Sequence, residues 1–401
     1  MKIQNKEAIM YQLKKSKSVL LMLSLVTVGF IGAGISVETE AKDRAAGFYT
    51  RGDVSKAPGS RNGYDDPTAS ASDPTKPTNW AKNVDGIVVQ LEWAALQSQK
   101  PETVPSGQDK LSTQLIEDAL ADVREWNAVP GNNKLGIKLR VFAGIYTPQW
   151  VKDEVGSSVL DFKGSSFDGE FPHYWKSAFK TRYKQFHGLL ANKYDSEPLI
   201  TEVAISGCMI KNADMHRARS EYQNINILID AGLTWQKDQD CQNWQINAVA
   251  GKWDTTWVSV ARPHFREFKK MASSPSKSDW PLSTSVMKET VETCRKAGNC
   301  VSGNNSLEQE DKDAKAFSND QHAIYYAASK YRGTRSKAPL YFQTDVKIVQ
   351  GSGVIHKIIG WGIKNSHVEM IELPTLKAFK KYDDAYLGSN AMQKKRTKLK
   401  N

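Results

Sequence analysis

The sequence lacks the motifs that mark several large enzyme classes. Its seven histidines show neither His-x-His nor His-Glu-x-x-His spacing, so a metalloenzyme is unsupported and no metal site is expected. No Gly-x-Ser-x-Gly motif is present, and Ser206-Gly207-Cys208 is only a fragment of one. No glycine-rich phosphate loop follows the strand pattern at residues 87–93, which removes support for a nucleotide-binding sheet.

The N-terminus has the pattern of a secretory signal peptide. A cationic stretch precedes an uncharged run over residues 19–35, and small side chains stand at Thr39 and Ala41. The pattern predicts a secreted protein, with residues 1–41 removed by cleavage after Ala41. The alternative is an uncleaved helix that anchors the protein in a membrane, since the run is just shorter than a spanning helix. An exported protein has no ATP or nicotinamide pool to draw on, so we expect no cofactor.

Cysteine is scarce: the chain has four, Cys208, Cys241, Cys294 and Cys300. An even number in a chain bound for an oxidising compartment permits two disulfide bonds. Cys294 and Cys300 are the favoured pair, because they flank a helix-ending turn in which Gly298 can take a left-handed conformation. Four unpaired thiols are the alternative.

The positive charge is unevenly distributed. Of the net charge of +11, the run 394–400 contributes five and residues 1–41 contribute two, which leaves four for the body of the chain. That modest excess does not support a nucleic-acid partner. We interpret residues 386–401 as a solvated basic tail that is able to contact an anionic cell-surface polymer.

Strand and helix patterns alternate after a segment, residues 42–80, that is rich in Pro, Ser, Asp and Gly. This segment is expected to be extended, with one short strand at residues 47–51. The later patterns predict strands at 87–93, 137–144, 200–206, 257–262, 340–344 and 368–373, and helices at 111–126, 174–194, 283–297, 322–332 and 354–364.

Such alternation predicts a parallel sheet covered by helices, either open and doubly wound or closed as a (β/α)8 TIM-type barrel. The barrel is favoured because several strands carry polar residues at alternate positions, which a barrel tolerates near the rim where its site lies. The patterns give seven strands, so an eighth is expected within residues 264–339. We predict one barrel domain over residues 81–385, with long loops.

Three segments carry a resemblance to a known family. Residues 84–93 and 138–151 resemble the second and third strands of barrel glycoside hydrolases of clan A, which include β-galactosidases and cellulase-like enzymes, and residues 367–374 resemble the eighth. The resemblance implies a general acid/base at the end of the fourth strand and a nucleophile at the end of the seventh.

Two carboxyl groups across the anomeric centre of the sugar are what glycoside hydrolysis requires. The fourth strand here has no Asn-Glu pair, and the nearest rim carboxylate after it is Asp214; the seventh strand offers Asp345. Glu372, near the end of the last strand, is a third candidate. For all three residues the alternative is structural, as a loop cap for Asp214 and as ion pairs for Asp345 and Glu372.

Aromatic residues beside polar ones at strand ends suit sugar binding, because rings stack on apolar sugar faces while hydroxyls need hydrogen-bond partners. The candidates are Gln90, Trp93, Arg140, Tyr146 and Trp150. The alternative for Trp93 and Trp150 is that they fill space between strand and helix. The sequence thus predicts a secreted protein that hydrolyses an extracellular carbohydrate, or a non-catalytic carbohydrate-binding or cell-surface protein on the same scaffold. A third interpretation is an exported binder of anionic polymer.

Overall fold

The computed structural model describes residues 41–52, 61–69, 76–77, 79–161, 168–209, 222–261, 265–273, 276, 278–307, 323–331, 338–344, 355–382 and 386–401. The chain divides into two compact units, Met1–Thr39 and Glu40–Asn401, and all the described residues belong to the second. Apart from Ala41, the expected signal peptide lies outside them. Among the helices of the described residues, none is both long and apolar enough to cross a membrane.

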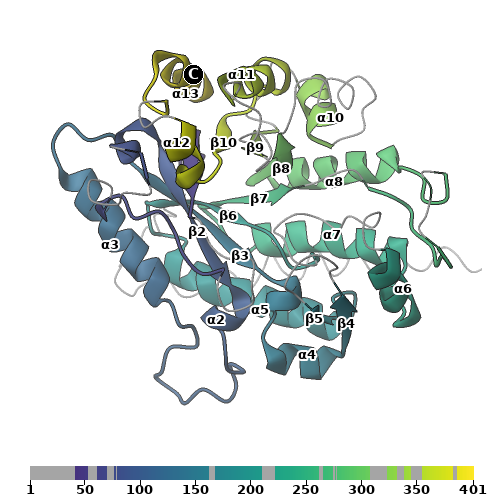
Figure 1. Ribbon diagram of the computed structural model, residues 1–401. Helices are drawn as coiled ribbons and strands as arrows, with labels where there is room; N and C mark the ends of the chain where they lie inside the picture. The colour runs from purple at the N-terminus through teal and green to yellow at the C-terminus, as the bar shows by residue number, and fades with distance from the viewer. Residues whose placement is uncertain are drawn as a thin grey trace, which may run out of the picture. The chain divides into compact units, whose positions relative to one another are not determined.

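Eight parallel strands close into a barrel (Figure 1). In spatial order they are β1 (Gly47–Arg51), β10 (Met370–Glu372), β9 (Leu340–Thr344), β8 (Cys300–Leu307), β7 (Trp257–Ala261), β6 (Ile200–Ala204), β3 (Gly136–Phe142) and β2 (Gly86–Glu92). The predicted barrel is confirmed. Its eighth strand, β8, lies within the stretch where a hidden strand was expected.

Helices between the strands cover the outside of the barrel (Figure 1). They are η2 (Trp80–Asn83), α2 (Trp93–Leu96), α3 (Gln114–Ala128), η3 (Gly144–Tyr146), α4 (Gln149–Val155), α5 (Ser177–Tyr194), α6 (Tyr222–Asp230), α7 (Trp235–Ala250), α8 (Thr284–Ala297), α10 (Ala323–Lys330), α11 (Ile355–Ser366), α12 (Leu376–Tyr382) and α13 (Asn390–Lys400). A hairpin of β4 (Ser157–Asp161) and β5 (Asp168–Pro172) follows β3 and packs against α4.

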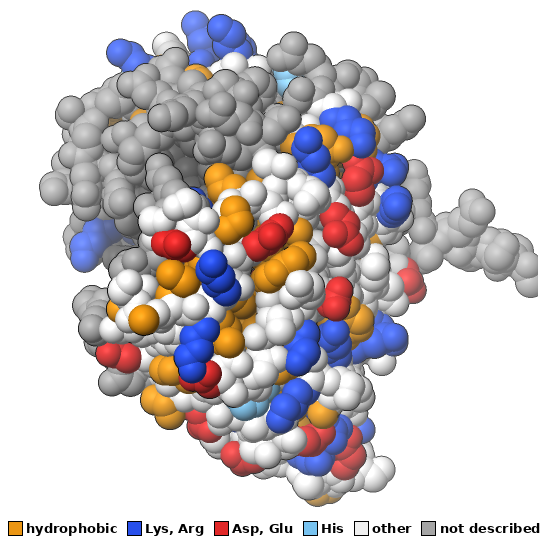
Figure 2. All heavy atoms as spheres, turned by 90° about the vertical axis from the view of Figure 1, so that its right-hand side faces the viewer, with side chains coloured by type: hydrophobic (Ala, Val, Ile, Leu, Met, Phe, Trp, Pro, Cys, Tyr) orange, Lys and Arg blue, Asp and Glu red, His pale blue; other side chains and the backbone are white. Residues whose placement is uncertain are grey.

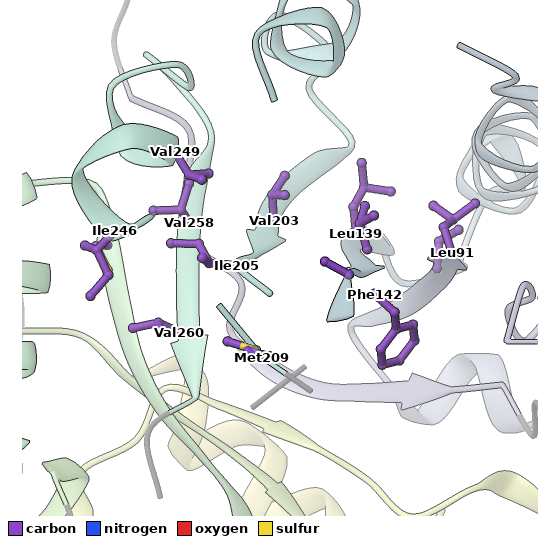
Figure 3. Close-up of a cluster of buried hydrophobic side chains, with 14 of the residues drawn as sticks. Leu91, Leu139, Phe142, Val203, Ile205, Met209, Ile246, Val249, Val258 and Val260 are labelled. Atoms are coloured by element: carbon purple, nitrogen blue, oxygen red, sulfur yellow. The ribbon is translucent and has the colours of Figure 1, made fainter. Parts of the chain in front are cut away.

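The two faces of each strand meet different environments. In β2, Ile87, Val89 and Leu91 belong to the main core between strands and helices, whereas Val88 belongs to a small apolar cluster inside the barrel. Because side chains alternate along a strand, Gln90 and Glu92 share the inward face with Val88. Figure 3 shows part of this core: Val258 and Val260 of β7 lie near Ile246 and Val249 of α7, and side chains of β6, β3 and β2 continue the cluster.

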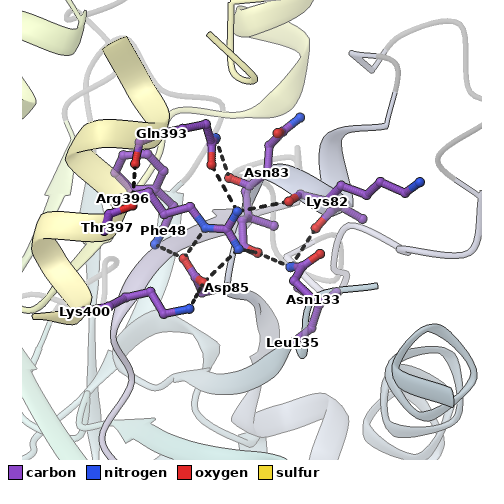
Figure 4. Close-up of polar contacts among 12 residues, drawn as sticks. Phe48, Lys82, Asn83, Asp85, Asn133, Leu135, Gln393, Arg396, Thr397 and Lys400 are labelled. Atoms are coloured by element: carbon purple, nitrogen blue, oxygen red, sulfur yellow. Dashed lines mark hydrogen bonds and ion pairs between the residues drawn. The ribbon is translucent and has the colours of Figure 1, made fainter. Parts of the chain in front are cut away.

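Both ends of the described chain contribute to the barrel domain. The strand predicted at residues 47–51 is present as β1 and closes the barrel between β2 and β10, and part of the expected basic tail forms the helix α13. Two basic side chains of α13, Arg396 and Lys400, reach Asp85 just before β2, at 2.7 and 3.0 Å (Figure 4). Asp85 also accepts a hydrogen bond from the backbone N–H of Phe48. The interpretation of the whole run as a solvated end is therefore wrong for Arg396, whose side chain is largely buried, whereas Lys400 stays exposed.

Both disulfide bonds are present, Cys294–Cys300 and Cys208–Cys241, with Cα–Cα distances of 5.1 and 6.0 Å. Gly298, which ends α8 between the first pair, has a φ of +85°. Only glycine adopts this backbone conformation without steric cost, so the turn brings Cys294 and Cys300 together as its sequence predicts.

Candidate functional site

The predicted catalytic carboxylates fall into two groups. Asp214 and Asp345 lie outside the described residues. Glu372 is described: it is the last residue of β10, and its side chain is fully buried inside the barrel. Of the three candidates, the structure therefore gives surroundings for Glu372 alone.

Glu372 belongs to an interior ion cluster, which we define as Lys138, Arg140, Glu202 and Glu372. The Nζ of Lys138 lies 2.5 Å from Oε1 of Glu202 and 2.9 Å from Oε1 of Glu372. Arg140 donates a hydrogen bond to the other oxygen of Glu372. All four side chains are almost completely shielded from solvent. Two cations therefore face two carboxylates inside the barrel, each within reach of an opposite charge.

The cluster keeps Glu372 ionised. Burial raises the pKa of this carboxyl, but Arg140 and Lys138 outweigh that effect and hold the pKa at about 2. Burial opposes the charge of Lys138 too, and Glu202 and Glu372 outweigh it, so its pKa is raised. A general acid needs a pKa near the working pH. As placed, Glu372 is unsuited to donate a proton, and its surroundings match the structural alternative of an ion pair.

Trp93, which directly follows β2, points away from the barrel interior. Trp93 packs against Phe179, Tyr183 and Phe186 of α5, with ring centroids 5.1–5.9 Å apart, and its Nε1 donates to Gln97. It is fully buried. These contacts match the alternative in which Trp93 fills the space between strand and helix.

Trp150, on α4, has a similar position outside the barrel. Its Nε1 donates to the backbone oxygen of Gln97 at 3.1 Å, and the guanidinium of Arg182 lies 5.6 Å from its ring centroid. The indole nitrogen that could bind a sugar hydroxyl is therefore already hydrogen-bonded within the protein.

A second group of side chains, the rim cluster, gathers where β2 and β3 end. We define it as Arg61, Glu92, Phe142 and Tyr146. The guanidinium of Arg61 lies 4.5 Å from the ring centroid of Phe142 and 5.2 Å from that of Tyr146. Glu92 accepts a hydrogen bond from the backbone N–H of Arg61 at 3.2 Å. The four side chains are largely buried against one another.

A backbone bridge places Arg61 at this rim. Gly63 pairs antiparallel with Gln90, beyond the point at which β1 ends, and the side chain of Gln90 donates to the backbone oxygen of Gly52. The backbone N–H of Glu92 donates to Asn62. Residues 61–63 therefore lie beside the last part of β2. Of the predicted sugar-binding residues, Gln90 and Tyr146 lie at this rim, and Arg140 joins the interior cluster.

The rim cluster shows what sequence reasoning missed. Neither Glu92 nor Arg61 is a candidate from the sequence: Glu92 is one of several polar residues in strands, and Arg61 lies in a segment without periodicity. The signal available in the sequence was the alternation of Gln90 and Glu92 at the end of a strand.

The hydroxyl of Tyr146 in the rim cluster keeps its proton at neutral pH. Burial raises the pKa of Tyr146 to about 12, with Arg61 lowering it and Glu92 raising it.

The segment that follows β6 is anchored firmly where it is described. Cys208 is joined to Cys241 of α7, its backbone N–H donates to Gln245, and Gln242 donates to its carbonyl oxygen. Asp238, one turn earlier in α7, accepts from Gln242 and from the hydroxyl of Tyr174. These buried polar groups hold the C-terminal end of the fourth barrel strand against α7.

Within the described part of the chain, His, Cys, Asp and Glu side chains form no group of three that could hold a metal ion. On the face shown in Figure 2, Lys and Arg side chains are interspersed with Asp and Glu side chains over the described residues. Such mixing is ordinary for a soluble surface.

No family model and no curated protein matches the sequence. Several solved structures are similar to this chain in fold. An endo-glycoceramidase II from Rhodococcus sp. matches with a TM-score of 0.43 and 10% identity over 84% of this chain and 75% of that chain. A GH10 endoxylanase from a sugarcane soil metagenome matches with a TM-score of 0.40 and 10% identity over 86% and 90%.

A β-galactosidase from the psychrophilic Marinomonas ef1 matches with a TM-score of 0.39 and 10% identity, over 71% of this chain and 48% of that chain. The chain thus spans about half the length of that enzyme. At 10% identity and TM-scores of 0.39–0.43, these matches report a likeness of fold alone.

Proposed function

We propose that the protein is exported and hydrolyses glycosidic bonds of an extracellular carbohydrate at the C-terminal opening of its barrel. The observation that carries the proposal is the rim cluster, which gathers a carboxylate, a guanidinium and aromatic rings where β2 and β3 end. Active sites of such barrels are built at this end of the strands. Aromatic and hydrogen-bonding groups together are what a sugar requires.

The chemistry needs two carboxyl groups, about 5–5.5 Å apart for retention of configuration or about 6.5–9.5 Å apart for inversion. We assign these roles to Asp214 as acid/base and Asp345 as nucleophile, the positions that the strand motifs imply. Glu372 remains a third candidate. With a pKa held at about 2 it could act only in its ionised form, as a nucleophile or as a stabiliser of positive charge.

A non-catalytic carbohydrate-binding protein is the second candidate, and a specific observation favours it. The two carboxylates of the interior ion cluster, Glu202 and Glu372, both face cations of β3 at ion-pair distance. A carboxylate held in this way contributes charge and rigidity more readily than it transfers a proton. In that case the same rim would bind a glycan without cleaving it.

Binding of anionic polymer by the basic C-terminal run remains a further prediction with less support. Arg396 and Lys400 are engaged with Asp85, which leaves exposed lysines such as Lys394 and Lys398 to make such a contact. These exposed charges belong to α13.

The test is an assay of the secreted protein against a broad panel of chromogenic glycosides and polysaccharides, with a glycan array in parallel. Asp214→Asn and Asp345→Asn are each expected to lower kcat by a hundredfold or more while Tm is preserved. Glu125→Gln, which changes an exposed carboxylate on α3, is the control and should leave kcat unchanged. Glycan binding without turnover on any substrate would establish the binder instead, and neither turnover nor binding would refute both.

Glu372→Gln separates a catalytic from a structural role for this carboxylate. A structural ion pair predicts a fall in Tm with kcat of the folded fraction nearly unchanged. Loss of kcat at an unchanged Tm would instead place Glu372 in the catalytic machinery.

A further inference from the structure

The first described residues of the chain cross the N-terminal opening of the barrel. All eight strands are parallel, so their N-terminal ends lie at one edge. The backbone N–H of Lys42 donates to the carbonyl of Thr255 at 3.0 Å, and its carbonyl accepts from Nε1 of Trp257 at 2.8 Å. Trp257 is the first residue of β7. Lys42 is thus fixed to the edge opposite the proposed site.

The side chain of Lys42 joins the entry of a neighbouring strand, β6, to that of β7. Its Nζ donates to the carbonyl oxygens of Glu197 and Ile200 at 2.7 and 3.0 Å, and to the hydroxyl of Thr256 at 2.7 Å. An ammonium group has three N–H donors, so each has a partner here. Burial lowers the pKa of Lys42 and outweighs the opposing effect of Asp195 and Glu197, so the resulting pKa is about 8. The amine therefore still carries its charge at neutral pH.

Arg44 ties the same segment to the last strand. Its Nε and one terminal nitrogen donate to the two oxygens of Glu369, each at 2.7 Å, and its guanidinium lies 5.2 Å from the ring centroid of Trp257. Glu369 directly precedes β10. A paired arrangement of this kind is the strongest that arginine makes with a carboxylate. Glu369 thus has the paired, structural role that its position in the sequence suggests.

Ala45 is the residue at which this segment enters the barrel interior. It is 4% exposed and belongs to the apolar cluster inside the barrel, with Tyr49, Val88, Tyr341 and Met370. Asp43, in contrast, is exposed. Within four residues the chain therefore passes from contacts around the edge of the barrel into its interior.

We propose that residues 42–45 form a plug that closes the N-terminal opening of the barrel, and that processing after Ala41 leaves this plug whole as the first residues of the exported protein. A cut after Ala41 removes none of the contacts described for these residues. The nitrogen of Lys42 then becomes an α-amino group, which can still donate to Thr255. A cut four residues further on removes the Lys42 and Arg44 contacts together. The barrel thus sets a limit beyond which the leader cannot be trimmed without loss of stability.

The test combines the natural N-terminus with the stability of trimmed chains. The full-length chain is expressed in a secreting host, and the N-terminus of the exported protein is read by intact mass and Edman sequencing. Chains that begin at residue 42 and at residue 46 are released from a cleavable tag for comparison. The chain from 42 should match the exported protein in Tm, and the chain from 46 should melt about 5–10 °C lower, because it lacks several partly buried charge-assisted hydrogen bonds.

Full-length variants keep the test decisive if the shorter chain fails to fold. Lys42→Met and Arg44→Met should each lower Tm, whereas Asp43→Asn, between them and exposed, should leave it unchanged. Equal Tm for the chains from 42 and 46, or an exported protein that begins after Ala45, would overturn the proposal. None of these readouts depends on activity, so the result is independent of the proposed glycosidase function.

Discussion

The ammonium group of Lys138 lies 3.6 Å from the ring centroid of Tyr341, in the closed interior of the barrel. The ring in turn occupies the space next to Gly303 of β8: a Cβ there would lie 1.9 Å from Cε1 of Tyr341. A glycine on one strand therefore makes room for an aromatic ring on the next, and that ring covers the cation that joins Glu202 and Glu372. The packing of Tyr341 against Gly303 and the ion pairs of Lys138 therefore depend on each other.

Replacing Lys138, the central cation of the interior ion cluster, should lower the free energy of unfolding strongly. Lys138→Met leaves Glu202 without its ion-pair partner and Glu372 with Arg140 alone, in surroundings closed to water. Breaking a buried pair on one side costs about 3–5 kcal/mol. We expect a loss of that size in the free energy of unfolding from urea titration. Lys110→Met, at an exposed lysine, is the control. A loss below about 1 kcal/mol would mean that the cluster relaxes or admits water.

Adding Glu202→Gln to Lys138→Met should recover part of the loss, because the second change removes the carboxylate that the first leaves unpaired. If the double variant is as unstable as the sum of the two single variants, the two side chains are not coupled.

Acid should destabilise the protein through His187. This side chain is fully buried, its Nδ1 accepts from Nε1 of Trp253 at 3.3 Å, and burial lowers its pKa from 6.5 to about 3. Between these values the unfolded chain binds a proton that the folded one does not, so stability is full above pH 6.5 and falls toward pH 3. His187→Gln keeps an acceptor and should flatten the dependence by up to about 1.4 kcal/mol per pH unit.

The measurement for His187 is the urea midpoint as a function of pH for both proteins. Glu372 contributes in the same direction at lower pH, since its stabilisation is present above its unfolded pKa of 4.5 and is lost as pH falls toward 2. Parallel curves for His187→Gln and the unmodified protein between pH 6.5 and 4.5 would show that His187 does not govern that range.

The two disulfide bonds should differ in their effect on stability. Cys208–Cys241 closes a loop with a sequence separation of 33, and Cys294–Cys300 one of 6. In the chain-entropy model, loss of the bond costs about 4 kcal/mol for the longer loop and about 2 kcal/mol for the shorter. The Cys208→Ala/Cys241→Ala protein should therefore melt below the Cys294→Ala/Cys300→Ala protein in calorimetry. The reverse order would contradict the loop-length argument.

The helix α13 should stabilise the barrel through one arginine. Arg396→Met removes the two-pronged contact to Asp85, which keeps Lys400 and the N–H of Phe48 as partners. We expect a loss of about 2–3 kcal/mol, the size of charge-assisted hydrogen bonds at a largely buried carboxylate. Lys394→Met, on an exposed position of the same helix, should have no effect on the unfolding midpoint. Equal unfolding midpoints for the two variants would mean that the basic run 394–400 does not stabilise the barrel and is simply solvated.

The strand and helix order could be predicted because it depends on short-range periodicity. The sequence patterns predict neither the exact position of the eighth strand, β8, nor the helix α7, and each has a physical reason. The sequence of β8, Cys-Val-Ser-Gly-Asn-Asn-Ser-Leu, has little apolar alternation, since Gly303 accommodates Tyr341. The buried face of α7 carries Asp238, Gln242 and Gln245, which are linked to one another by hydrogen bonds, so no apolar stripe marks the helix.

Residues close together in the chain were enough to predict the strand and helix order, the turn between Cys294 and Cys300, and the polar character of the strand ends, and they favoured a barrel over an open sheet. Contacts between distant segments are what make Trp93 pack outward on α5 and bring Arg140 to Glu372, 232 residues away. A single strand pattern does not reveal which cation lies across a closed barrel. Closure brings those groups within hydrogen-bonding distance, and shielding from water then turns a candidate catalytic glutamate into a paired one.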